Sequence, residues 1–299
     1  MEGGGNEGRV ILVSGATGQQ GGAVAWNLLE RGFAVRALTR DTGKEAAREL
    51  ADFGAEVVSG DLEDRASIER VLDGVYGLFS VQQFMETGVE GEVRQGGLLA
   101  DAAKASGVEH LVYSSVGSAH RDTGIPHFDS KFEVEEHVRA SGVPYTVVRP
   151  VFFMQNWEFM REHILGGTLV QPLDPEKPFQ MIDAWDIGVF AAMAFDDPGT
   201  WIGREVDIAG DELTMPEIAG TFSRVIGRNV EYVQVPWKDF EEQMGKEYTV
   251  MYRWFNEEGY EANIAALRDE YPGLSSFEQY LRAHGWENAE VFSKVRAEN

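Results

Sequence analysis

Residues 9–40, RVILVSGATGQQGGAVAWNLLERGFAVRALTR, hold the pattern that decides the fold. The apolar run at 9–14 predicts a strand buried on both faces of a parallel sheet, and a glycine-rich turn follows it directly. Apolar residues then recur at helical spacing over 20–29, and Gly32 stands where the end of a helix favours a left-handed residue. Residues 34–39 are again strand-like, so the stretch predicts a strand, a helix and a second strand in succession.

The same alternation continues as far as residue 148. Helices are predicted over 44–53, 65–72, 89–105 and 128–140, and strands over 56–59, 75–81, 109–114 and 145–148. Six strands in strict alternation with helices predict an α/β fold, a doubly wound parallel Rossmann sheet with right-handed crossovers.

Beyond Pro150 the alternation ends and aromatic residues become dense. A helix predicted over 183–195 returns the chain to the main sheet. We therefore expect a flexible tail at 1–8 and a Rossmann domain at 9–150 with a return segment near 183–208. Residues 151–182 and 209–299 are expected to form a smaller C-terminal α+β lobe, in which the aromatic side chains serve core and lid packing.

Composition excludes several classes of function. The 299 residues carry 50 acidic and 26 basic side chains, a net charge of −24, which opposes extended contact with nucleic acid. The absence of cysteine excludes disulfides and thiolate chemistry, and the histidine spacing predicts no metal site. No apolar run suits a signal peptide or a membrane span, so we expect a cytoplasmic protein without membrane contact. The acidic surface either aids solubility or reflects a host with high internal salt.

The glycine-rich turn is the first candidate site, and it consists of Gly15, Ala16, Thr17, Gly18, Gln19, Gln20 and Gly21. Its place between a buried strand and the first turn of a helix is the one that phosphate binding requires. Gly15 would allow a sharp exit from the strand, Gly18 close approach to a pyrophosphate, and Gly21 tight packing of helix on strand. The helix amides would direct partial positive charge at the phosphates. The alternative is a structural turn without a ligand.

The end of the second predicted strand indicates which dinucleotide binds. Arg40 and Lys44 stand there instead of an acid, and a guanidinium matches a phosphate through paired hydrogen bonds, so NADP(H) is favoured over NAD(H). Asp41 could pair with Arg40 and weaken that preference. After the third strand, Asp61 could accept from the adenine amino group with Leu62 packed on the ring, or Asp61 could be a helix N-cap or turn residue.

The segments GATGQQG, ALTR, GDLED, HFDSKFEVEEH and RPVFFMQN together resemble the NmrA-like family of atypical short-chain dehydrogenases/reductases. The resemblance is close over the first 160 or so residues. It implies an NADP(H)-binding Rossmann domain with a smaller lobe closing over the nicotinamide end. Some members are NADPH sensors that bind regulatory proteins, and others reduce quinones, dyes or phenylpropanoid substrates.

The resemblance also implies roles for single residues. The loop 15–21 would bind the pyrophosphate, Arg40 and Lys44 the 2′-phosphate, and Lys131 the nicotinamide ribose. Two further sets follow: Phe153, Gln155 and Asn156 would lie beside the nicotinamide, and the strand end with Phe79, Ser80, Val81 and Gln82 would line the dinucleotide from below.

The sequence departs from the wider superfamily at the catalytic pair. The usual Tyr four residues before the Lys is replaced by His127, so the phenol that an ammonium normally activates is missing. His127 with Lys131 could supply the proton instead, or His127 could be a helix-start residue facing solvent or the second lobe. Tyr113 is expected to turn toward the helical layer, whereas Ser114 or Ser115 is expected either to face the cofactor or to be a satisfied strand-end hydroxyl.

Two functions remain open at this stage. An intact dinucleotide site beside an incomplete proton-transfer pair indicates an NADP(H)-binding redox sensor with a regulatory protein partner. The alternative is an NADPH-dependent oxidoreductase acting on an apolar, aromatic or quinone-like molecule, a carbonyl or a conjugated double bond. An aromatic wall of Phe84, Phe152, Phe153 and Trp157 would favour that alternative.

Overall fold

The computed structural model describes residue 6 and residues 8–288. Its contacts divide the chain into two compact units: unit 1 comprises residues 1–150 and 184–207, and unit 2 comprises 151–183 and 208–299. Residues 1–5 and 7 of the predicted tail, and residues 289–299 of the predicted lobe, lie outside the described residues.

Unit 1 is built on a seven-stranded sheet. Its strands are β1 (Val10–Val13), β2 (Ala34–Thr39), β3 (Glu56–Ser59), β4 (Gly77–Ser80), β5 (His110–Ser114), β6 (Tyr145–Pro150) and β10 (Glu205–Ile208). They are ordered β10-β6-β5-β4-β1-β2-β3, and neighbours from β3 to β6 pair in parallel. The chain order reverses between β1 and β4, so the prediction of a doubly wound parallel sheet is confirmed.

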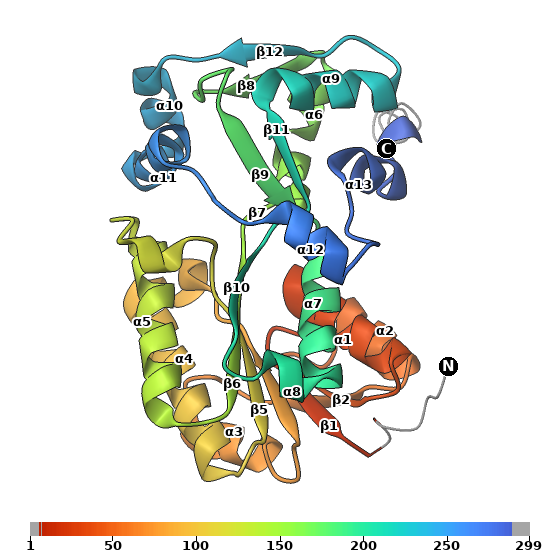
Figure 1. Cartoon of the computed structure of the whole chain (residues 1–299). Coiled ribbons are helices and arrows are strands. Elements are labelled where there is room, and N and C mark those ends of the chain that lie inside the picture. The colour runs from red at the N-terminus through yellow and green to blue at the C-terminus, as the bar shows by residue number, and fades with distance from the viewer. Residues whose placement is uncertain (1–5, 7, 289–299) are drawn as a thin grey trace. The chain divides into compact units, whose positions relative to one another are not determined.

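Helices cover both faces of this sheet (Figure 1). They are α1 (Gln19–Glu30), α2 (Glu45–Asp52), α3 (Arg65–Val71), α4 (Phe84–Ala105), α5 (Pro126–Ser141), α7 (Ala184–Asp196), α8 (Pro198–Trp201) and the short 3₁₀ helix η1 (Ala119–Arg121). In Figure 1, α3, α4 and α5 lie on one face, and α1, α2 and α7 on the other. The left-handed glycine predicted after α1 is confirmed, because φ of Gly32 is +80°.

Helix α4 begins earlier than the sequence predicts. The prediction starts at residue 89, whereas the structure adds a first turn at 84–87 that a non-helical Gly88, with φ 71° and ψ 175°, separates from the rest. The apolar periodicity starts only after that glycine, which is why the first turn was missed.

The core of unit 1 follows from strand alternation. Tyr113 and Leu111 point toward α4 and α5 and pack among Leu99 and Val134, so Tyr113 faces the helical layer as predicted. On the opposite face, Gly77 provides room for Phe195 of α7, because a Cβ at that position would lie 2.7 Å from the phenyl ring. The sheet is therefore buried on both sides, as its nearly continuous apolar strands require.

Unit 2 has shorter elements. Its strands are β7 (Phe152–Phe153), β8 (Thr168–Gln171), β9 (Pro178–Ile182), β11 (Asp211–Thr214) and β12 (Glu231–Gln234), in one sheet ordered β11-β9-β7 and another ordered β12-β8. Its helices are α6 (Arg161–Leu165), α9 (Met215–Ile226), α10 (Trp237–Met244), α11 (Lys246–Glu257), α12 (Ile264–Glu270) and α13 (Phe277–Ala283), with 3₁₀ turns η2 (Met154–Met160) and η3 (Trp286–Asn288).

Aromatic rings make up much of the core of unit 2. Phe222 lies 5.2 Å from Phe277 and 4.8 Å from Trp286 between ring centroids, and all three side chains are fully buried. Such tilted and edge-on contacts stabilise a core beyond the area that they bury. The aromatic density of the C-terminal third therefore serves packing within this unit.

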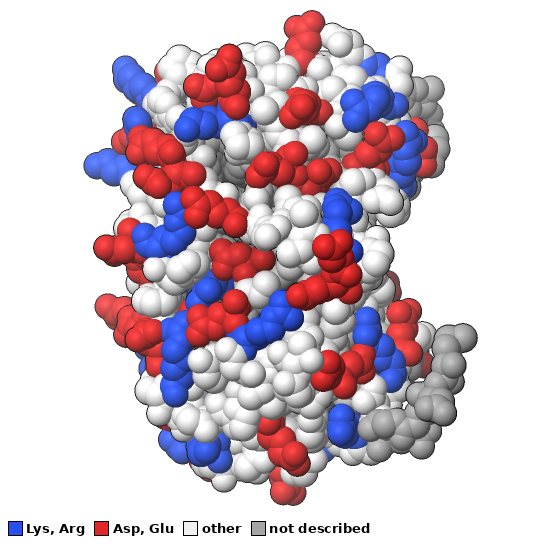
Figure 2. Space-filling view, in the orientation of Figure 1, with Lys and Arg blue, Asp and Glu red and all other residues white. Residues whose placement is uncertain are grey.

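Figure 2 shows how charged side chains are distributed on one face of the molecule. On the face drawn in Figure 2, acidic side chains are interspersed with basic ones. A distributed acidic excess of this kind keeps a surface hydrated. Among the described residues, no helix combines the length and the apolar character that crossing a bilayer would require.

Candidate functional site

The carboxyl ends of β1 and β4 form the point at which the strand order reverses, and ligands of open α/β sheets bind at such points. The hydroxyl of Ser14 joins the two strand ends. It accepts from the backbone N–H of Val81 at 2.8 Å and donates to the carbonyl of the same residue at 3.1 Å. Sequence reasoning missed this role, although Ser14 is a polar residue at the end of an apolar strand.

The glycine loop leads from this point into α1. The N–H of Gly18 donates to the carbonyl of Gly15 at 2.9 Å, and Gly18 is the N-cap residue of α1. Gly15 has a φ of +61°, a left-handed conformation that favours glycine. A Cβ on Gly21 would lie 2.3 Å from the carbonyl oxygen of Gly15, so helix and loop approach more closely than any other residue would allow.

The exposure of the loop suits an anion. Gly15, Gly18 and Gln19 are exposed, Thr17 and Gln20 are half-buried, and Ala16 and Gly21 are buried. The first backbone amides of α1 have no partner within the helix and carry the positive end of its dipole. The chain thus brings glycine backbone and helix amides together, and a pyrophosphate fits such a donor set. Ser114 also reaches the loop, because its hydroxyl donates to Oε1 of Gln20 at 2.7 Å.

The cations predicted for the 2′-phosphate lie just beyond β2. Arg40 follows the strand directly, and Lys44 is the N-cap residue of α2; both are exposed. The structure corrects one expectation, because the carboxylate that pairs with Arg40 is Glu86 of α4, at 2.7 Å, rather than Asp41. The Asp41 side chain instead accepts from the N–H of Gly43 at 2.8 Å, as a turn residue does.

The loop after β3 is held by its own hydrogen bonds. The side chain of Asp61 accepts from the N–H of Glu63 at 3.0 Å, and Asp64 is the N-cap of α3. Leu62 is half-buried against the core. The turn role weighed for Asp61 is therefore present, and the helix-cap role belongs to Asp64. Contact of Asp61 and Leu62 with an adenine stays a prediction.

The strand end at 79–82 is largely internal. Phe79 is fully buried in the core, and Val81 and Gln82 are only 9% and 4% exposed. A Cβ on Gly15 would meet Cγ1 of Val81 at 3.0 Å, so Val81 lies against the glycine loop. The backbone carbonyl of Gln82 accepts a hydrogen bond from Lys131 of α5, and the side-chain amide of Gln82 donates to the hydroxyl of Ser80 at 2.9 Å.

Lys131 lies in an ion pair with a carboxylate that the sequence reasoning did not identify. Its Nζ donates to Oε1 of Glu92 at 2.7 Å and to the carbonyl of Gln82 at 3.4 Å. Glu92 is fully buried, and its other oxygen accepts from the hydroxyl of Ser130 at 2.6 Å. A signal existed in the sequence, since Glu92 stands one heptad before Leu99 on the face of α4 that is buried.

His127 lies in the first turn of α5, one turn before Lys131, and does not face solvent. Only 9% of the residue is exposed, and its ring stacks on Phe84 with centroids 4.5 Å apart and planes 11° apart. Tyr113, a phenol in β5, is fully buried, and burial raises its pKa well above the usual value. Neither group is arranged like the activated Tyr of an ordinary dehydrogenase.

The residues predicted to lie beside the nicotinamide belong to unit 2. Phe153 pairs with Ile182 between β7 and β9, Asn156 is half-buried in η2, and Gln155 donates to Asp183 at 2.6 Å. Trp157, assigned to the aromatic wall, is 1% exposed and part of the core of this unit. Its ring therefore serves packing.

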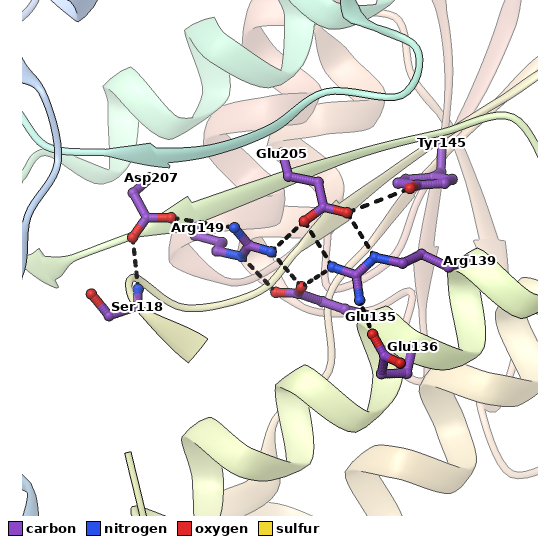
Figure 3. Close-up of polar contacts among 8 residues, drawn as sticks. All are labelled: Ser118, Glu135, Glu136, Arg139, Tyr145, Arg149, Glu205 and Asp207. Atoms are coloured by element: carbon purple, nitrogen blue, oxygen red, sulfur yellow. Dashed lines mark hydrogen bonds and ion pairs between the residues drawn. The ribbon is translucent and has the colours of Figure 1, made fainter. Parts of the chain in front are cut away.

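An ion-pair network holds the helix that carries His127 and Lys131 (Figure 3). Arg149 of β6 donates to both oxygens of Glu135 on α5, at 2.9 and 2.7 Å, and to Glu205 of β10 at 2.5 Å. Arg139 donates to both oxygens of Glu205 at 2.7 Å. Arg149 and Glu135 are buried, and the charge of Arg149 in the otherwise apolar β6 was the signal that could have identified it.

The network also reaches the loop between β5 and α5. Asp207 accepts from the N–H of Ser118 at 2.7 Å and lies 3.6 Å from Arg149. Ser118 has a φ of +63°, which is uncommon outside glycine, so this hydrogen bond holds a strained turn. The Arg139 guanidinium lowers the pKa of Glu205 to about 2, whereas burial raises the pKa of Asp207.

Together, the fold and the loop define a doubly wound α/β protein with a glycine-rich turn at the switch point of its sheet. The model of the NmrA-like family matches residues 7–281, and the chain therefore belongs to the NmrA-like family. The resemblance that the sequence motifs indicated is confirmed.

Three relatives are informative. An NAD(P)H azoreductase of Xenophilus azovorans is 33% identical, over 79% of this chain and 80% of its own length. A (4-alkanoyl-5-oxo-2,5-dihydrofuran-3-yl)methyl phosphate reductase of Streptomyces griseus is 34% identical, over 76% of this chain and 77% of its own. The crystal structure of NmrA, a negative transcriptional regulator, in complex with NADP has a TM-score of 0.76 at 25% identity, covering 93% of this chain and 95% of that one.

Proposed function

We propose that this chain binds NADP(H) on unit 1 and acts as an NADP(H)-responsive regulator. The glycine loop would hold the pyrophosphate, and Arg40 with Lys44 the 2′-phosphate. Support comes from the left-handed Gly15, from the contact that only glycine allows at position 21, and from the exposure of both cations. The NADP complex of NmrA, a regulator, supports the same assignment for the family to which this chain belongs.

The observation that carries the regulatory role is the ion pair of Lys131. An ammonium group has three N–H donors. Two of them point to Glu92 and the Gln82 carbonyl, which leaves one for a ribose hydroxyl. With a carboxylate at 2.7 Å and His127 in place of a Tyr, Lys131 is suited to hold a nucleotide rather than to activate a proton donor.

A second candidate is an NADPH-dependent reductase, favoured by the 33% and 34% identity to two proteins named as reductases. His127 would then donate the proton that accompanies hydride transfer. Imidazole titrates near neutral pH, and a quinone or conjugated acceptor can also take its proton from solvent.

Two measurements separate these functions. NADPH binding is titrated by fluorescence, and loss of NADPH absorbance is followed with a panel of quinones, aldehydes and azo dyes. A regulator binds NADPH, consumes none above the buffer rate, and changes its proteolysis pattern when NADPH is added. Turnover of any acceptor above the buffer rate would establish the reductase instead, its loss in His127→Phe would assign the proton transfer to His127, and failure to bind NADPH would overturn both functions.

Lys131→Ala is the variant that completes the comparison. It should weaken NADPH binding in either case, whereas only a reductase has turnover to lose. Lys104→Ala is the matched control, because Lys104 lies at the far end of α4 and, among the described residues, donates to the carbonyl of Gly142 at 2.7 Å. Equal loss of binding in both variants would show that Lys131 has no particular role.

A further inference from the structure

The ion pair between Arg40 and Glu86 joins two parts of unit 1 that are far apart in the sequence. Nη2 of Arg40 lies 2.7 Å from Oε2 of Glu86, and the side chains are 64% and 48% exposed. Arg40 follows β2, while Glu86 belongs to the first turn of α4. The guanidinium proposed to read the 2′-phosphate thus already has an anionic partner within the protein.

The turn that carries Glu86 is separate from the rest of α4. Gly88, with φ 71° and ψ 175°, breaks the helix two residues after Glu86. On the other side of Glu86, Phe84 stacks on His127. The turn at 84–87 is therefore bounded by a glycine break and a ring contact, so Glu86 can change its partner without unwinding the buried part of the helix.

We propose that Glu86 is a specificity-determining residue that competes with a 2′-phosphate for Arg40 and so sets the preference between NADP(H) and NAD(H). This inference rests on the proposed nucleotide binding. A monoester phosphate carries between one and two negative charges near neutral pH, and a carboxylate on the same guanidinium repels it. To bind the phosphate, Arg40 must release Glu86 or hold two anions together.

Binding of the NAD(H) ribose does not require Arg40 to release Glu86. Its 2′-hydroxyl is neutral and can donate to a carboxylate. In NAD-binding sheets of this type an acid at the end of the second strand accepts from that hydroxyl. In this chain Glu86 brings an acid to the same neighbourhood from α4, so the cation and the acid compete at one end of the site.

The exposure of the Arg40–Glu86 ion pair determines how much its loss should change the affinity for NADPH. Exposed ion pairs contribute little, so breaking this one should cost NADPH about two- to fivefold in affinity. Glu86→Gln removes both that cost and the repulsion, and should tighten NADPH binding by at least about two- to fivefold. NADH binding should stay unchanged or weaken, so the ratio of the two dissociation constants moves toward NADPH.

Glu90→Gln provides the matched control. Glu90 lies four residues after Glu86, beyond the break at Gly88, is exposed and carries the same charge, but among the described residues the carboxylate paired with Arg40 is that of Glu86. Arg40→Ala completes the set by removing the residue for which the two anions compete. Because all three side chains are exposed, the variants should fold, and thermal unfolding checks this.

The experiment titrates NADPH and NADH into the full chain and its variants at low and high KCl. Tightening of NADPH by Glu86→Gln but not by Glu90→Gln, and less of it at high salt, would support the inference. The inference is wrong if Glu86→Gln binds NADPH no more tightly than the parent protein, or if Glu90→Gln matches it. If the parent protein binds neither nucleotide, the proposed function itself fails, which is a separate result.

Discussion

The contact of Gly21 with the glycine loop allows a sharp test. In Gly21→Ala the new methyl group would lie 2.3 Å from the carbonyl oxygen of Gly15 and 2.7 Å from that of Ser14. Both atoms belong to the backbone, so no side chain can rotate away. In Gly22→Ala, the next position of the same helix, the methyl group would meet only the carbonyl oxygen of Ala16, at an ordinary 3.4 Å.

The two variants share the helix-propensity gain of alanine over glycine, about 1 kcal/mol, so it cancels in their comparison. What differs is overpacking, which costs about 1–3 kcal/mol. At about 2 °C per kcal/mol for a chain of this size, Gly21→Ala should melt about 2–6 °C below Gly22→Ala. Relief of the clash must move α1 away from the loop by about 1 Å, which can cost up to about a hundredfold in a geometry-dependent interaction.

Thermal unfolding and NADPH titration of both variants measure these effects. We expect Gly22→Ala to melt at or above the parent protein and to bind NADPH normally. Gly21→Ala should melt lower and bind NADPH at least about tenfold more weakly. Equal melting temperatures and equal NADPH affinities for the two variants would refute the argument that the helix must approach the loop through Gly21.

Three further outcomes are expected. Tyr113→Phe should raise the free energy of unfolding by about 1 kcal/mol, because the hydroxyl is buried with no hydrogen-bond partner among the described residues; an unchanged or lower midpoint in urea unfolding would contradict that reading. Arg149→Met should lower the free energy of unfolding by about 3 kcal/mol in urea unfolding, since buried Glu135 loses its bidentate partner; an unchanged midpoint would show that Arg139, which also donates to Glu135 at 2.8 Å, suffices alone. The pKa of Glu205 is lowered to about 2 from an ordinary 4.5, so its stabilisation is present above pH 4.5 and lost toward pH 2. Melting curves should therefore separate the parent protein from Glu205→Gln at pH 5 and bring them together at pH 2.5, whereas a constant separation would exclude this linkage.

The sheet and its glycine loop could be predicted because their signals are local. A buried parallel strand reads as an apolar run, and β1 and β3 begin and end within a residue of the predicted limits. The first turn of α4 could not be predicted in this way, since Gly88 interrupts the period and no apolar stripe crosses it.

The charged partners of the candidate site were harder to predict, because each joins residues far apart in the chain. Glu86 meets Arg40, and Glu92 meets Lys131, 39 positions away. Asp41 was the obvious partner of Arg40 by proximity in sequence, yet its carboxylate is used in a turn with Gly43. Nearby backbone N–H groups compete with Arg40 for the carboxylate of Asp41. Proximity in the chain therefore indicated the wrong partner for Arg40.

The sequence by itself determined the fold class and the place of the glycine loop, because these depend on residue type and spacing along one or two elements; it also indicated the cations Arg40, from its place after a strand, and Lys131, from the family resemblance. Only the tertiary structure decided how those cations are neutralised, with an exposed carboxylate at Arg40 and a buried one at Lys131. The strength of a charge interaction depends on distance and on exclusion of water. Both are set by the packing of α4 against the sheet and α5, which no spacing within a single segment reveals.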